Sequence, residues 1–131
     1  MIINNLNDYL FDKVKNLNYD YDTKSYIVSI FDKFKKSDFD YSKNSLTCIY
    51  ARANETNNFI IFQNLGDWLF FCSVIFPGHL KNASEEYYIS LGQMSYYNCY
   101  KLINKQWKLY EKLADDFSTL TEQTREVILE F

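Results

Sequence analysis

One stretch of the chain, residues 59–76, limits the possible folds more than any other part of the sequence. It reads FIIFQNLGDWLFFCSVIF, is apolar on nearly every helical face, and is followed by Pro77 and Gly78. Its length approaches the roughly 20 apolar residues that span a bilayer. Asp67 lies near its middle, however, and an Asp at the centre of a membrane helix costs about 2.5–3.5 kcal/mol. The stretch therefore predicts a buried central helix and no membrane span, because a helix that is apolar all round must be covered by other helices.

Glycine and proline are scarce, since the 131 residues include only three Gly and one Pro. Sandwiches and barrels use these residues at their many turns, so their scarcity favours helices. A chain of this length is also typical of one domain. We therefore predict an all-α fold in which residues 1–131 form a single domain, a bundle of six or seven helices.

A second long helix is predicted over residues 84–104, with Asn82 or Ser84 as its N-cap. Small side chains recur on one face of both long helices: Gly92, Ser95 and Cys99 on this one, and Gly66 and Ser73 on the central one. We expect these faces to let the two backbones approach closely. The two helices are then the centre of the bundle.

Shorter amphipathic stretches flank this pair. Apolar residues recur at helical spacing over residues 6–17, 26–34 and 46–53, and Thr23 is interpreted as the N-cap of the second of these helices. Toward the C-terminus a similar stripe covers residues 107–117. Thr121 is predicted to cap a last short helix.

Charge and cysteine content exclude several classes of protein. Fourteen basic and seventeen acidic residues leave a net charge of −3, and Lys alternates with Asp and Glu, whereas nucleic-acid-binding proteins carry a basic face. Cys48, Cys72 and Cys99 form no CxxC pair, and His79 is the only histidine. These residues match no disulfide framework or zinc motif. We therefore expect reduced thiols, a cytoplasmic location, no nucleic-acid partner, no metal and no cofactor.

Four residues are candidates for ligand binding, and no catalytic residue is assigned. Asp67 is the only charged residue between Glu55 and His79, and a buried carboxylate needs a partner or a raised pKa. It is interpreted either as a packing residue held by Tyr, Trp or backbone groups, or as a ligand contact that orients a ligand together with Tyr88 or Tyr96. His79 follows Pro77, where it caps the central helix or serves as a base. A direct pair of Asp67 and His79 is disfavoured, because they are about 15 Å or more apart along a helix axis.

Spaced residues between Tyr50 and Phe117 form a pattern: Leu65-Gly66-Asp67, Leu69-Phe70, Phe76-Pro77, Tyr87-Tyr88, Leu91-Gly92 and Tyr96. The pattern resembles a family of small uncharacterised bacterial all-helical proteins. This resemblance implies an all-helical fold built on the two central helices. It brings no established activity.

Three functional hypotheses follow from these residues. The leading one is a non-enzymatic helical protein that acts through protein–protein contacts, with a protein partner or with itself as a homodimer, because its apolar faces are large for so short a chain. The second is a binder of a small apolar or aromatic ligand in an interhelical pocket near Asp67. The third is an enzyme that uses Asp67 or His79 as a base, which is disfavoured because no nucleophile–base pair can be assembled.

Overall fold

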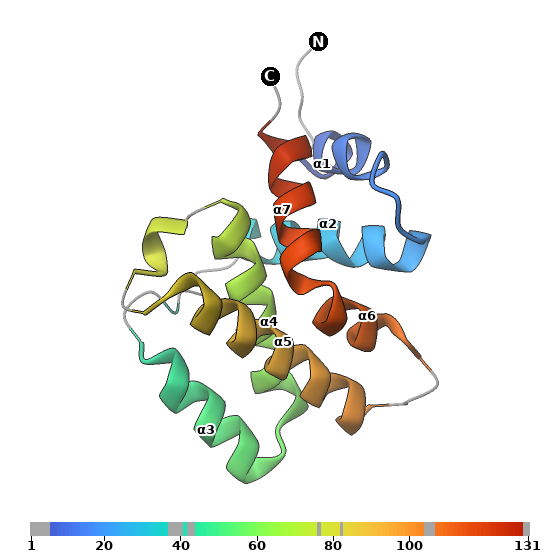
Figure 1. Ribbon diagram of the computed structural model, residues 1–131. Helices are drawn as coiled ribbons and strands as arrows, with labels where there is room; N and C mark the ends of the chain where they lie inside the picture. Colours follow the sequence, from blue (N-terminus) through green and yellow to red (C-terminus); the bar gives the residue numbers. More distant parts are fainter. Residues whose placement is uncertain are drawn as a thin grey trace.

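The computed structural model of the chain describes residues 6–36, 41, 44–75, 77–81, 83–103 and 107–129 (Figure 1). All regular secondary structure in those ranges is helical, which confirms the all-α prediction. The elements in chain order are α1 (Leu6–Val14), α2 (Tyr21–Lys36), α3 (Leu46–Thr56), α4 (Phe59–Val74), the 3-10 helix η1 (Pro77–His79), α5 (Glu85–Leu102), α6 (Leu109–Asp115) and α7 (Phe117–Ile128).

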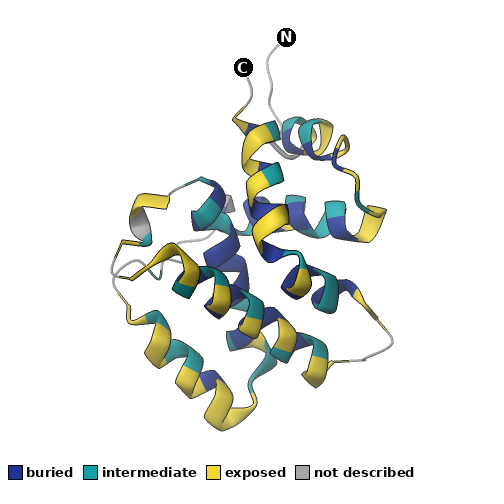
Figure 2. Ribbon diagram, in the orientation of Figure 1, coloured by how far each residue is buried: buried dark blue, intermediate teal, exposed yellow. Residues whose placement is uncertain are grey.

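The predicted central helix is α4, and other helices surround it. Figure 2 shows α4 as mostly buried ribbon, whereas the outward side of α3 is exposed. α5 is the main packing partner of α4, and α2, α3 and α7 also contact it. The residues that α4 buries point to all of its sides: Phe62, Leu65, Gly66, Asp67, Trp68, Leu69, Phe70, Cys72 and Val74. The central pair predicted over 59–76 and 84–104 is therefore confirmed, with observed bounds of 59–74 and 85–102.

No helix in the described residues is long and apolar enough to cross a membrane. α4 has 16 residues. At 1.5 Å per residue it is about 24 Å long, whereas the hydrocarbon core of a bilayer is about 30 Å thick.

Side-chain caps begin the central helices. Ser84 accepts a hydrogen bond at Oγ from the backbone N–H of Tyr87 at 3.1 Å, which confirms one of the two predicted caps of α5. Asn58 accepts the backbone N–H of Ile61 at 3.1 Å and begins α4 in the same way. Each bond satisfies an N–H that has no partner within its own helix.

The two threonines predicted as N-caps lie inside their helices instead. The Oδ1 atom of Asp20 accepts the backbone N–H of Thr23 at 2.8 Å, so α2 begins three residues earlier than predicted. A carboxylate is as good a cap as a hydroxyl, and here it is placed first along the chain. α7 begins at Phe117, and Thr121 donates its hydroxyl proton to the carbonyl of Ser118 at 3.0 Å.

At the two central glycines, the atoms nearest to an added Cβ belong to aromatic rings. A Cβ added at Gly66 would lie 2.8 Å from Cε1 of Tyr96 on α5. A Cβ added at Gly92 would lie 2.4 Å from Cζ of Phe117 on α7. Both rings are fully buried. The small residues therefore position α5 against α4 and α7 through ring packing.

Candidate functional site

The carboxylate of Asp67 joins three helices in the interior. Its Oδ1 atom accepts hydrogen bonds from the hydroxyls of Tyr26 on α2 at 2.7 Å and Tyr96 on α5 at 2.8 Å. Its Oδ2 atom accepts one from Nζ of Lys33 on α2 at 2.9 Å. Asp67 is 3% exposed, whereas the Lys33 side chain is 31% exposed and reaches the surface.

Further polar side chains of α4 continue this cluster. Lys33 also donates to the amide oxygen of Asn64. Gln63 lies one helical turn before Asp67 on α4, and its side-chain amide donates a hydrogen bond to the hydroxyl of Tyr110 on α6 at 2.6 Å. The ring of Tyr110 packs edge to face on that of Tyr26, with centroids 5.5 Å apart. The polar residues inside the apolar stretch therefore face α2, α5 and α6 together.

Burial dominates the electrostatics of this cluster. It raises the pKa of Asp67, while the Lys33 ammonium and the two tyrosine hydroxyls act in the opposite direction. Burial and the Asp67 carboxylate raise the pKa of both Tyr26 and Tyr96 well above the ordinary value for tyrosine, so both hydroxyls stay protonated and donate. Burial also raises the pKa of the Cys99 thiol, which is therefore not a thiolate nucleophile.

The geometry around Asp67 favours a packing role. Protein donors occupy both of its oxygens, and the residue is closed to solvent. A ligand could reach the carboxylate only by displacing a tyrosine hydroxyl or the Lys33 ammonium. This arrangement argues against an interior ligand at Asp67. The predicted tyrosine partners are present, whereas Lys33 was not foreseen, because it lies 34 residues away on α2.

The structure brings together only two of the four candidate residues. Tyr96 bonds to Asp67, as described above. Tyr88 lies two turns before Tyr96 on α5 and lines a cavity that is described below. His79 belongs to η1, and its side chain lies outside the described residues.

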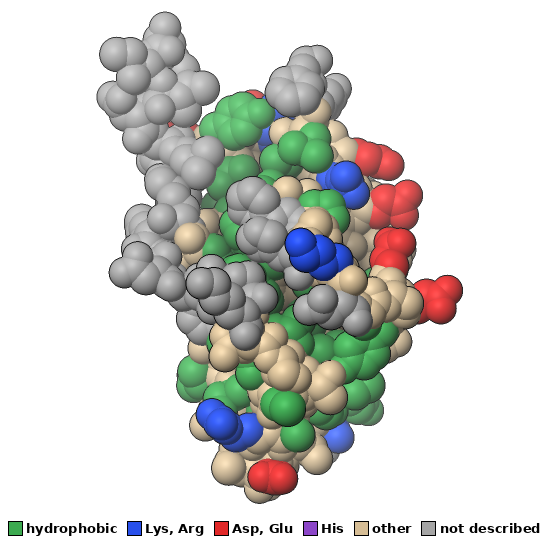
Figure 3. Space-filling model, turned by 90° about the vertical axis from the view of Figure 1, so that its left-hand side faces the viewer, with side chains coloured by type: hydrophobic (Ala, Val, Ile, Leu, Met, Phe, Trp, Pro, Cys, Tyr) green, Lys and Arg blue, Asp and Glu red, His purple; other side chains and the backbone are tan. Residues whose placement is uncertain are grey.

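A cavity of about 370 Å³ opens between the end of α4, η1, α5 and α7, and we call it the α5–α7 cavity. The first part of its lining comes from α4, η1 with the residue after it, and α5: Ser73, Pro77, Leu80, Glu85, Tyr88 and Ile89. The second part comes from α7: Ser118, Thr121, Glu122 and Arg125. Figure 3 shows one flank of the molecule, on which acidic side chains line the right-hand edge with basic side chains beside them. The lining combines apolar walls, hydroxyls and charges of both signs.

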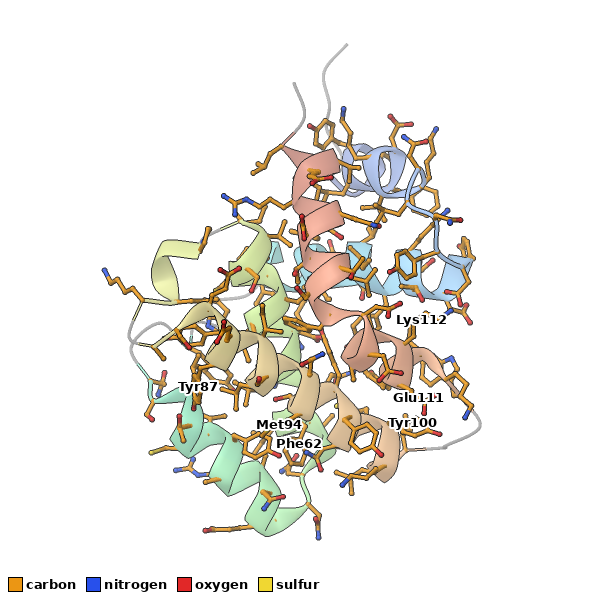
Figure 4. All side chains as sticks on the ribbon, viewed as in Figure 1. Phe62, Tyr87, Met94, Tyr100, Glu111 and Lys112 are labelled. Carbon is orange, nitrogen blue, oxygen red and sulfur yellow. The ribbon has the colours of Figure 1, made fainter. Side chains whose placement is uncertain are left out.

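A second surface feature extends along α5 and just beyond it. It consists of Met94, Tyr97, Tyr100, Leu102, Ile103 and Trp107, which we call the α5 patch. Five of these six are among the large hydrophobic side chains that are at least 36% exposed in the described residues; Tyr100 is half-buried. The rings of Tyr97 and Tyr100 are 6.1 Å apart, and Lys101 lies over the first and Lys108 over the second. Figure 4 labels Met94 and Tyr100 on α5 and Glu111 on α6. Lys108 contacts both of the last two, with Nζ 3.1 Å from the Tyr100 hydroxyl and 3.7 Å from the Glu111 carboxylate.

Within the described residues, no group of three or more His, Cys, Asp or Glu side chains could hold a metal ion. No protein-family model, curated protein or solved structure shows significant similarity to this chain. Function must therefore be inferred from the chain's own residues.

Two sets of surface residues escaped prediction from the sequence. No local pattern distinguishes Glu122 and Arg125 from other charged surface residues, and only the packing of α7 beside α5 shows that they line a cavity. Exposure of Tyr97 and Trp107 was equally hidden, because a high aromatic content does not distinguish core rings from surface rings. The feature that could have found Tyr97 is its position opposite the small-residue face of α5.

Proposed function

We propose that this chain acts by binding protein through the α5 patch, and that its partner is a second copy of the chain. The observation that carries the proposal is the concentration of exposed apolar side chains between Met94 and Trp107, of which Tyr97 is 46% and Trp107 42% exposed. Aromatic and Met side chains are enriched in the centres of protein interfaces. Tyr and Trp are also over-represented among the residues that dominate binding energy.

The rim of the patch supports pairing with a second copy. A two-fold interface brings the same surface of both chains together, so it must complement itself. The rim carries Lys101 over the Tyr97 ring, and Glu111, whose carboxylate lies 3.7 Å from Nζ of Lys108. In a two-fold pair, Lys101 of one copy can face Glu111 of the other. Charges of both signs therefore border an apolar centre, as a self-complementary surface requires.

The closed interior also supports a role at the surface. The Asp67 carboxylate is occupied by Tyr26, Tyr96 and Lys33, and it is not accessible to a substrate. A non-enzymatic function through protein contacts is consistent with this arrangement.

Sedimentation velocity over a concentration series tests the proposal. The weight-average mass of the wild-type protein should rise from 15.7 kDa toward twice that value with increasing concentration. Replacement Tyr97→Ser should raise the dimer Kd by about tenfold or more, because it truncates an exposed ring at the patch. The matched control is Tyr21→Ser, which removes a ring that is 70% exposed on α2 and contacts Phe11 outside the patch.

Two results would contradict the proposal. One is a wild-type protein that remains a monomer throughout the series. The other is a dimer whose Kd is the same for the wild-type protein and Tyr97→Ser.

We further propose that the protein resides in a reducing bacterial cytoplasm. None of the three cysteines forms a disulfide within the described residues, and Cys72 and Cys99 are buried. Buried free cysteines behave as small apolar residues, and they persist most readily where thiols are kept reduced. The bacterial origin rests on the pattern from Leu65 to Tyr96 alone.

A further inference from the structure

We propose that the α5–α7 cavity binds a small zwitterion with an apolar side chain, an α-amino acid or a compound of the same chemistry. The cavity volume of about 370 Å³ lies at the lower end of the roughly 300–1,000 Å³ typical of small-molecule sites. This site is separate from the α5 patch. The inference therefore does not depend on dimer formation.

Unpaired charges of opposite sign indicate a ligand with two charges. Glu85 comes from α5, and Glu122 and Arg125 come from α7. None of these three side chains has an ion-pair partner among the described residues. A guanidinium binds a carboxylate through two parallel hydrogen bonds, and a carboxylate accepts hydrogen bonds from an ammonium group. A zwitterion can satisfy both signs, whereas a ligand with a single charge leaves one sign unmatched.

Apolar and hydroxyl groups complete the cavity. Leu80, Ile89 and the Tyr88 ring provide apolar surface for a ligand side chain. Tyr88 is only 7% exposed, so its ring is held in place by packing. The hydroxyls of Ser73 and Ser118 add hydrogen-bonding groups to the lining. A lining that contains charged and apolar side chains suits a ligand with a charged end and an apolar side chain.

Three matched probes test the charge requirement. L-Leucine carries both charges, 3-methylbutylamine lacks the carboxylate, and 4-methylpentanoate lacks the ammonium group, while all three have similar branched side chains. Binding to the full chain is measured by ligand-observed NMR and calorimetry, with L-phenylalanine as a second zwitterion. We expect at least one zwitterion to bind, and to bind about tenfold more tightly than either singly charged probe. No binding of either zwitterion at millimolar concentration, or equal binding of a singly charged probe, would overturn the proposal.

Charge-removing variants assign the binding to this cavity. Arg125→Gln and Glu122→Gln should each weaken zwitterion binding by about tenfold. The matched controls are Arg52→Gln on α3 and Glu126→Gln on α7, which are exposed and lie outside the cavity lining. Both controls should stay within twofold of the wild-type Kd. All four residues are exposed, so circular dichroism should show wild-type melting for each variant. Unchanged binding by Arg125→Gln would show that the probe binds elsewhere, and would overturn the proposal.

Discussion

Gly92 is the position where two physical effects predict opposite results for one added methyl group. A Cβ built there would lie 2.4 Å from Cζ, 2.6 Å from Cε2 and 3.0 Å from Cε1 of Phe117. Helix propensity alone favours Gly92→Ala by about 1 kcal/mol, since Gly92 lies inside α5. Packing opposes it, because the added carbon overlaps the ring.

The surroundings of Phe117 decide which effect is larger. The ring is fully buried, and its centroid lies 5.8 Å from that of Phe70 and 6.0 Å from that of Tyr96. The ring therefore packs against two other aromatic rings in the core. Overpacking a core typically lowers the free energy of unfolding by about 1–3 kcal/mol, and an overlap this close is expected to cost about 3 kcal/mol or more. We therefore expect Gly92→Ala to lower the free energy of unfolding by about 1–2 kcal/mol net of the propensity gain.

Urea unfolding followed by circular dichroism measures this effect. Ser90→Ala, at an exposed position on the same helix, is the control and should be neutral or slightly stabilising. The same Gly92→Ala change is then made in a Phe117→Leu background, where the ring is absent and the penalty should disappear. A stabilising Gly92→Ala, or an equal penalty in both backgrounds, would refute the packing argument.

Three further predictions concern polar groups. Burial raises the pKa of Asp67 above its ordinary 3.8, so the Asp67 carboxyl stays protonated to a higher pH in the folded state than in the unfolded state. The Asp67 contribution to stability therefore falls as pH rises from 3.8 through the raised pKa, and urea unfolding at several pH values should show that Asp67→Asn lacks this dependence. Asp20 behaves oppositely: hydrogen bonds from Lys112 and Thr23 lower its pKa to about 2, so its contribution is present above pH 3.8 and is lost as pH falls toward 2. The Asp20 side chain is 54% exposed, so screening limits this contribution to about 1 kcal/mol or less, measured as the difference from Asp20→Asn at pH 6. The buried hydroxyl of Thr124 has no hydrogen-bond partner among the described residues, so Thr124→Val should raise stability by about 1 kcal/mol in the same assay, and a loss would contradict this reasoning.

Helix content and the central pair could be predicted because they depend on local patterns. The continuous apolar run of α4 and the cap at Ser84 are both local features, each contained within a short segment of the chain. Errors arose where two local signals competed, as at Thr23, where the carboxylate of Asp20 supplies the cap three residues earlier. The boundary between α6 and α7 was also predicted wrongly, because the apolar stripe was expected to continue through residue 117. The turn at Asp116 interrupts the helix, while the buried stripe continues from Leu113 to Phe117 and hides the break.

The candidate sites could be predicted only in part, because they depend on how helices are rotated against one another. Asp67 and Tyr96 were identified from composition and periodicity, and they are in contact. Lys33 was not, since nothing local indicates which lysine of a solvated helix face turns toward the core. The α5–α7 cavity was likewise hidden, although one of its residues, Tyr88, was a candidate for ligand binding.

The buried cluster at Asp67 connects the interior to both proposed surface sites. Removing a carboxylate from water is costly, and its partner Lys33 stays partly exposed. We therefore infer that this pair contributes more to specifying one arrangement of the helices than to stability. Here one carboxylate on α4 receives donors from α2 and α5, so any rotation or slip of α5 would leave a buried charge without its Tyr96 partner. α5 carries the exposed Met94 and Tyr97 of the α5 patch, and its first turns line the cavity. The hydrogen bond between the buried Asp67 carboxylate and Tyr96 thus fixes the rotation of α5, and with it which residues of α5 face the core and which lie at the surface.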